Sequence, residues 1–162
     1  VEHDNAKTMR RVAVAGFDDA YNANANLTWS DEVERGQGPV WKAVRYGETI
    51  CVQDIATDPQ MTPWRESASL HGCRSGIALP LKEESGEVFG VFMIYSANIN
   101  AFTTEEIRLL EELSGDLAFG ITVLRIRLEH QQAEETISQL AAIVASSDDA
   151  IIGKTLDGII TS

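Results

Sequence analysis

The chain has 162 residues, 44% of them hydrophobic, and its 13 basic and 25 acidic side chains give a net charge of −12. This length suits one domain with an appendage, and the acidic balance argues against binding to nucleic acid or to anionic lipid, because both need clustered cations. No apolar run approaches the roughly 18 residues of a membrane span. The two cysteines are expected to be free thiols, because nothing in the sequence indicates an oxidising compartment. We therefore expect a cytoplasmic location.

The first predicted elements are a strand and a short helix. Val12 and Val14 alternate with their neighbours, which predicts a half-buried strand over residues 9–15. A polar stretch follows and is expected to form a loop. Pro39 suits the first turn of a helix, where its missing N–H group has no partner to lose, and Gly47 suits the end of that helix.

A second helix and a hairpin are predicted next. Thr62 followed by Pro63 indicates an N-cap and a first helical residue. Residues 74–82 and 88–96 are apolar runs joined by a polar turn, which is typical of an antiparallel hairpin. Pro80 lies inside the first run, so this strand is expected to be an edge strand or to carry a bulge. Helices interspersed with antiparallel strands indicate an α+β fold.

A long helix is predicted over residues 103–145. Thr103 and Glu106 have the spacing of a capping box, and Phe102 and Ile107 that of a hydrophobic staple. No proline interrupts the run, and a helix of about 40 residues would be about 60 Å long. A domain of about 100 residues has a radius of gyration of only about 13 Å, so part of this helix is expected to project.

This helix carries two apolar stripes. One includes Leu109, Leu113 and Gly120 and is expected to pack on the sheet. The other has the a and d spacing of a coiled coil, fades at Gln131 and resumes out of phase at Ile137. A monomeric bundle that buries both stripes is the alternative. The residues expected to form a parallel homodimer and to carry the signal are Leu110, Leu117, Ile121, Leu124 and Leu128.

Three sequence blocks carry a family resemblance. Residues 36–59, 72–96 and 101–121 occur in the order and at the separations usual in a GAF domain, which they resemble. Residues 137–162 resemble the helix and first hairpin with which PAS domains begin. The resemblance implies a central antiparallel sheet of five or six strands flanked by helices, with a long C-terminal signalling helix. The sheet is expected to be truncated at its N-terminal end, because residues 1–8 are too short for the helix and strand usual there.

The resemblance also implies an organisation and a role. We expect a GAF domain over residues 1–125, a connecting signalling helix over 126–146 and an incomplete PAS domain over 147–162. The parent protein would be a bacterial sensor, most often a histidine kinase or a cyclic-di-nucleotide enzyme, with an effector domain further along. The module would bind an unknown small molecule or relay a signal through a dimeric helix; the alternative is a ligand-free dimerisation or spacer domain.

Several chemistries are not expected. The positions at which some GAF domains attach a bilin through cysteine, followed by histidine, hold Pro63 and Trp64 here, so no covalent bilin is expected. No Cys/His pair has metal-ligand spacing, so no bound metal is expected, and no other cofactor is expected either. No set of acid, base and nucleophile can be assembled, so catalysis by this fragment is not expected.

A small-molecule pocket is the remaining expectation. Arg74 could pair with an anionic ligand and Asp54 with an amine or hydroxyl group, while the tryptophans would supply apolar walls. The alternative for each residue is packing or a surface ion pair. The candidate ligand-binding residues are Trp29, Asp54, Trp64, Arg74, Ser75 and Tyr95.

Overall fold

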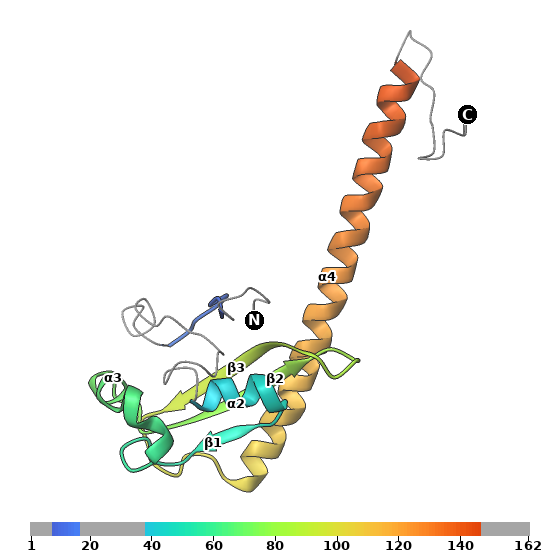
Figure 1. The fold of residues 1–162 in the computed structure, drawn as a ribbon. Coiled ribbons are helices and arrows are strands. Elements are labelled where there is room, and N and C mark those ends of the chain that lie inside the picture. The colour runs from blue at the N-terminus through green and yellow to red at the C-terminus, as the bar shows by residue number, and fades with distance from the viewer. Residues whose placement is uncertain (1–7, 17–37, 147–162) are drawn as a thin grey trace. The chain divides into compact units, whose positions relative to one another are not determined.

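The computed structural model describes residues 8–16 and 38–146. Two compact units are distinguished, residues 1–120 and 121–162, and the boundary between them falls inside the last helix. The candidate Trp29 and the hairpin predicted within residues 147–162 lie outside the described residues. In chain order, Figure 1 shows α2 (Pro39–Tyr46), β1 (Ile50–Val52), the 3-10 helix η2 (Pro59–Trp64), α3 (Arg65–Leu70), β2 (Ser75–Lys82), β3 (Val88–Ser96) and α4 (Thr104–Ser146).

The described part of the chain contains one antiparallel sheet of three strands in the order β1-β2-β3. This confirms the α+β fold, but the sheet has three strands there instead of five or six. The strand predicted over residues 9–15 is absent from the structure, and Val12 is 86% exposed. Two alternating valines offer little apolar area to offset the entropy of ordering a strand, which explains why the alternation was a weak signal.

Pro80 lies in the middle strand of this sheet. β1 pairs with Gly76, Ile77 and Ala78, so among the described residues β2 has no paired neighbour on that side at Pro80. The missing N–H group of proline therefore removes no ladder hydrogen bond to β1. A register shift between Leu81 and Lys82 adds the predicted irregularity. The register shift confirms the expected bulge or irregularity, whereas an edge position is wrong, because β2 is the middle strand of the sheet.

Both short helices are explained by their ends. In α2, Gly47 adopts the left-handed conformation with φ 64° and donates its N–H to Ala43 O at 3.0 Å, as predicted. The next helix differs from the prediction, because η2 begins at Pro59 instead of after Thr62. The Asp58 carboxylate accepts a hydrogen bond from Gln60 N at 2.8 Å and caps this turn four residues earlier.

The two faces of the sheet are covered by different elements. On one face, Ile77 and Leu79 form a cluster with Phe102, and Ile107 and Leu110 from the start of α4 pack against it. Residues with the opposite parity, such as Gly76 and Tyr95 (paired across β2 and β3), face the other way. There a second cluster joins Val52, Ile55, Met61, Ala68 and Cys73, with Trp64 and Tyr95 packed against it.

The helix α2 lies on this second face. It contacts all three strands, and its buried residues include Trp41, Ala43 and Val44. The backbone just before α2, at Gly38, meets the ring of Trp64, which packs on the second cluster. Residues 38–120 therefore form three layers: the start of α4, the sheet, and α2 with the η2–α3 segment (Figure 1).

The start of α4 is fixed as the sequence predicts. Thr103 N donates to the Glu106 carboxylate at 2.8 Å, and Glu106 N donates to Thr103 Oγ1 at 3.3 Å, which is the predicted capping box. Phe102 is buried and Ile107 packs in the same cluster, which is the predicted staple. The Gln53 side chain, directly after β1, accepts a hydrogen bond from Phe102 N at 3.4 Å and donates one to Phe102 O. These two bonds connect the start of α4 to the sheet.

The rotation of α4 about its axis differs from the expectation. The stripe with Leu109 and Leu113 was expected on the sheet, but these side chains are 53% and 51% exposed. The staple explains the difference: once Ile107 faces the sheet, a helix of 3.6 residues per turn turns Leu110, and after it Ser114, toward the sheet as well. Leu110 is therefore half-buried and packs against the cluster of Ile77, Leu79 and Phe102.

Candidate functional site

Two of the candidate aromatic residues come together on the second face of the sheet. Trp64 and Tyr95 both pack, half-buried, against the cluster that contains Val52 and Met61. A Cβ atom added at Gly76 would meet the Tyr95 ring at 3.0 Å, so this glycine makes room for the tyrosine. Both rings therefore cover this cluster, and Trp64 also lies beside the start of α2.

Three other candidates have structural surroundings. The Asp54 carboxylate accepts hydrogen bonds from Ala56 N and Thr57 Oγ1, both at 3.0 Å, and so holds its own loop. Ser75 is fully buried and donates its hydroxyl to Asn98 O at 2.8 Å. Arg74 is exposed, and its backbone joins the end of β3 to the loop before η2. The side chains of Asp54 and Ser75 are therefore already hydrogen-bonded within the described part of the chain.

Two buried donors that do not stand out in the sequence belong to the elements on this face of the sheet. Trp41 is only 9% exposed, and its indole Nε1 has no hydrogen-bond partner among the described residues. The Arg65 Nε atom is also buried without a hydrogen-bond partner in this part of the chain, although the Nη2 atom of the same residue donates to Asp58 O at 3.0 Å. Buried donors without acceptors are rare and each calls for an explanation. Trp41 belongs to α2, and Arg65 directly follows Trp64.

The cysteines have no chemical role that the geometry supports. Burial raises the pKa of both the Cys51 and the Cys73 thiol, which keeps them protonated and unreactive near neutral pH. Within residues 8–16 and 38–146, no cluster of His, Cys, Asp and Glu is arranged to hold a metal ion. No helix in this described part is long and apolar enough to cross a bilayer.

The residues expected at a dimer interface are spread over two environments. Leu110 packs in the core, as described above, and Ile121 is half-buried. Leu117 is 38% exposed, while Leu124 and Leu128 are 63% and 56% exposed. Only the last two lie clearly on a free surface of α4.

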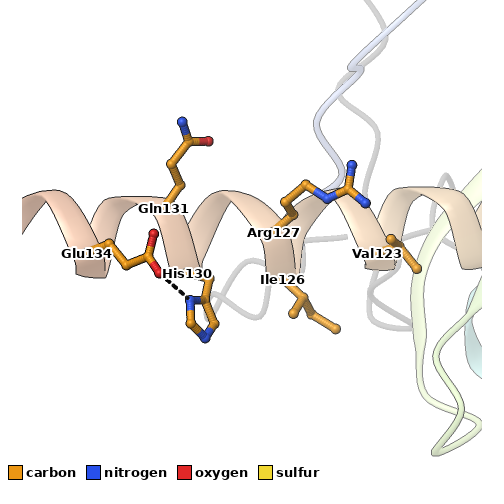
Figure 2. Close-up of a pocket in the computed structure, with 6 residues that line it drawn as sticks. All are labelled: Val123, Ile126, Arg127, His130, Gln131 and Glu134. Atoms are coloured by element: carbon orange, nitrogen blue, oxygen red, sulfur yellow. Dashed lines mark ion pairs between the residues drawn. The ribbon is translucent and has the colours of Figure 1, made fainter.

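A further row of side chains lies along α4 in the second unit. Figure 2 shows these side chains, with His130 Nδ1 3.6 Å from the Glu134 carboxylate. One helix cannot enclose a ligand, so we interpret this row as an exposed surface of the helix and not as a binding cavity. Its members are Val123, Ile126, Arg127, His130, Gln131 and Glu134.

Comparison with known families decides the identity of the fold. The family model described as a GAF domain matches residues 3–122. The chain belongs to the GAF domain family. Comparison with curated protein sequences gave no match. GAF domains are typically sensory or regulatory modules of signalling proteins, so this is the general class of function to which the chain belongs.

Solved structures give the same fold. A domain of a putative two-component sensor histidine kinase from Sinorhizobium meliloti is 26% identical, with a TM-score of 0.61 over 80% of this chain and 79% of that one. The GAF domain of the cyanobacteriochrome TePixJ is 16% identical, with a TM-score of 0.55 over 76% and 75%. The chain spans only 58% of a GAF region from a putative Geobacter sulfurreducens membrane protein, at 22% identity and a TM-score of 0.49 over 54% of this chain.

Proposed function

We propose that this GAF domain is a regulatory module that binds a small molecule and relays the binding event through a dimeric α4 to a downstream PAS domain and an effector domain. The single observation that carries the ligand hypothesis is the pair of buried, unpartnered donors Trp41 Nε1 and Arg65 Nε. Leaving a buried donor unpaired costs about 1–3 kcal/mol, and an acceptor on a ligand would recover this free energy.

Side chains on the elements that carry these donors, and on the sheet face that these elements cover, indicate the class of ligand. Trp64 and Tyr95 supply aromatic surface, and Lys42, on α2, adds a cation that donates to the side-chain oxygen of Gln60. Apolar walls with a few convergent polar groups are typical of small-molecule sites. We infer a small organic ligand with an apolar or aromatic part and a carboxylate or carbonyl oxygen. Asp54 and Ser75 hold the loops around this site and do not contact the ligand.

The relay rests on α4. Its first turns pack on the sheet through Ile107 and Leu110, so a ligand that shifts the sheet or α2 would bias the position of this helix. A homodimer would convert the bias into a change of helix packing, and differential binding of about 1–3 kcal/mol is sufficient for useful coupling. The likeness to a sensor histidine kinase domain supports a parent of that kind, and the resemblance of residues 137–162 supports a following PAS domain.

A thermal-shift screen tests the ligand hypothesis. The probes are benzoate, indole-3-acetate, amino acids, nucleotides and inorganic phosphate, each added to the 162-residue chain. We expect at least one carboxylate to raise the melting temperature of the wild type but not of Trp41→Phe, which keeps an aromatic ring and removes the N–H donor. If no probe discriminates the two proteins, the second candidate function, a ligand-free dimerisation or spacer domain, is favoured.

A further inference from the structure

The second unit of α4 contains a regular pattern that the expected dimer stripe does not include. Seven positions follow one another at intervals of three and four residues without a break, which is the spacing of positions a and d in a coiled coil. We call this set the 123–144 row. Its members are Val123, Ile126, His130, Ala133, Ile137, Leu140 and Val144.

Apart from the half-buried Val123, the members of the 123–144 row are exposed in the described structure. Ile126, Ile137, Leu140 and Val144 are 58%, 66%, 58% and 56% exposed, and Ala133 is exposed as well. Figure 2 shows Ile126 and His130 pointing to the same side of α4. Four large apolar side chains exposed in one regular row on a helix are more than scattered surface residues and indicate an interaction face.

The stripe expected from the sequence does not continue through this unit. After Leu124 and Leu128, its next two positions hold Gln131 and Glu135, both exposed. At 100° per residue, Leu128 and Ile137 lie about 180° apart around the helix, so one straight neighbour cannot cover both. The 123–144 row, in contrast, stays in phase over about 22 residues and includes every large apolar residue from 137 to 144 except Ile143.

We propose that the 123–144 row is the face through which α4 pairs, in parallel and in register, with α4 of a second copy of this chain. This inference rests on the dimer of the proposed function and names its interface. Three of the four a positions hold β-branched Val123, Ile137 and Val144, and Leu140 occupies a d position, a combination that favours two parallel strands. A single polar a residue, here His130, specifies register, because in a two-fold symmetric pair it meets its own copy.

The middle of this interface is its weakest part. His130 and Ala133 are the polar and the smallest members of the row, and they follow one another. Glu129 and Glu134 occupy the flanking g and e positions, so in a parallel pair Glu129 of one copy faces Glu134 of the other, which is a like-charge contact. An interface with two apolar ends and a weak centre can change its packing at low cost, as a signalling helix requires.

Sedimentation equilibrium of the 162-residue chain tests the proposal with matched variants. Ile126→Asp and Ile137→Asp place a charge in the row and are expected to weaken dimerisation by about tenfold or more. Leu124→Asp and Leu128→Asp place the same charge on equally exposed positions outside the row and are expected to change it by less than about threefold. The reverse pattern would overturn the row but leave the dimer of the proposed function intact.

Two further variants distinguish a weakened interface from a misfolded protein. His130→Ile replaces the polar a residue and is expected to tighten the dimer by about tenfold, a gain that damage to the fold cannot produce. Ile137→Cys is expected to form an interchain disulfide on mild oxidation, whereas Leu128→Cys is not, because only a and d positions face their own copy in a parallel pair and Leu128 occupies neither. A wild-type chain that stays monomeric at several hundred micromolar contradicts both the proposed dimer and the 123–144 row as its interface. A dimer whose dissociation constant is unchanged by every row variant contradicts only the row as the interface.

Discussion

The ring of Trp64 lies so close to the backbone of Gly38 that a Cβ atom there would stand 2.6 Å from its Cη2 atom. Gly38 is the N-cap of α2, with φ −76° and ψ −179°, a conformation open to any residue. Glycine is therefore required at this position for space and not for backbone freedom. The contact joins α2 to the η2–α3 segment and places the tryptophan as one wall of the candidate ligand site.

Replacing this glycine should dislodge the tryptophan. Gly38→Ala is expected to lower the free energy of unfolding by about 1–3 kcal/mol, because a rigid indole packed on the core cannot yield without strain. Urea unfolding at one fixed protein concentration, followed by tryptophan fluorescence, measures the change. An unaltered free energy of unfolding would show that Trp64 can move freely from its place.

The matched control for this substitution lies on α4. A Cβ atom at Gly115 would meet nothing within 4 Å. Gly115→Ala is therefore expected to raise the free energy of unfolding by about 0.5–1 kcal/mol, since alanine restricts the unfolded chain and has the higher helix propensity. The same urea titration checks this. A loss of stability would mean that another part of the protein packs closely on this side of the helix.

The rotation of α4 predicts different effects for two adjacent leucines. Leu110→Ala removes a side chain from the cluster of Ile77 and Leu79 and should cost about 1–3 kcal/mol of unfolding free energy. Leu109→Ala alters a side chain that is 53% exposed and should change it by less than about 0.5 kcal/mol. Chemical denaturation of the two variants decides the matter, and equal or reversed losses would contradict this rotation.

The capping box of α4 should give a pH-dependent contribution to stability. Hydrogen bonds from the Thr103 side chain and backbone lower the pKa of Glu106 from its ordinary value. A carboxyl group with a lowered pKa stabilises the fold above its ordinary pKa and loses this contribution as pH falls through the lowered value. The difference in unfolding free energy between wild type and Glu106→Gln should therefore be larger at pH 7 than at pH 3. A difference independent of pH would exclude an ionised cap.

The buried thiols should be protected from alkylation. Burial raises the pKa of Cys73, which is 2% exposed, so little thiolate forms in the folded protein near neutral pH. Iodoacetamide at pH 8 should label it far more slowly in buffer than in urea. Because its pKa is raised, its contribution to stability is full below the ordinary thiol pKa of 9.0 and declines as pH rises above it. Fast labelling of the folded protein would contradict the buried position.

The local signals in this sequence were more informative than the long-range ones. Pro39, Gly47 and the Thr103–Glu106 box predict helix ends correctly, because caps depend on neighbouring residues alone. The strand over residues 9–15 was wrong, since alternation does not show whether a neighbouring strand exists. The rotation of α4 about its axis could be predicted from the sequence, because the predicted staple already turns Ile107 toward the sheet.

The ligand-binding role of the candidate residues stays a prediction, but their surroundings could be foreseen only in part. Trp64 and Tyr95 share a cluster, and Asp54 and Ser75 hold neighbouring loops through hydrogen bonds that a list of polar residues does not reveal. Trp41 does not stand out in the sequence, because a tryptophan near the start of a helix normally suggests packing. Its unpaired N–H group becomes visible only when the residues around it are in place.

Native mass spectrometry of the freshly purified 162-residue chain tests the central claim, a dimeric module that holds a small molecule, most directly. The account predicts a mass of two chains with an additional small organic mass on each, and predicts that Trp41→Phe loses this addition while Ile137→Asp keeps it on a single chain. A mass of one chain, with nothing added, for the wild type would contradict the account.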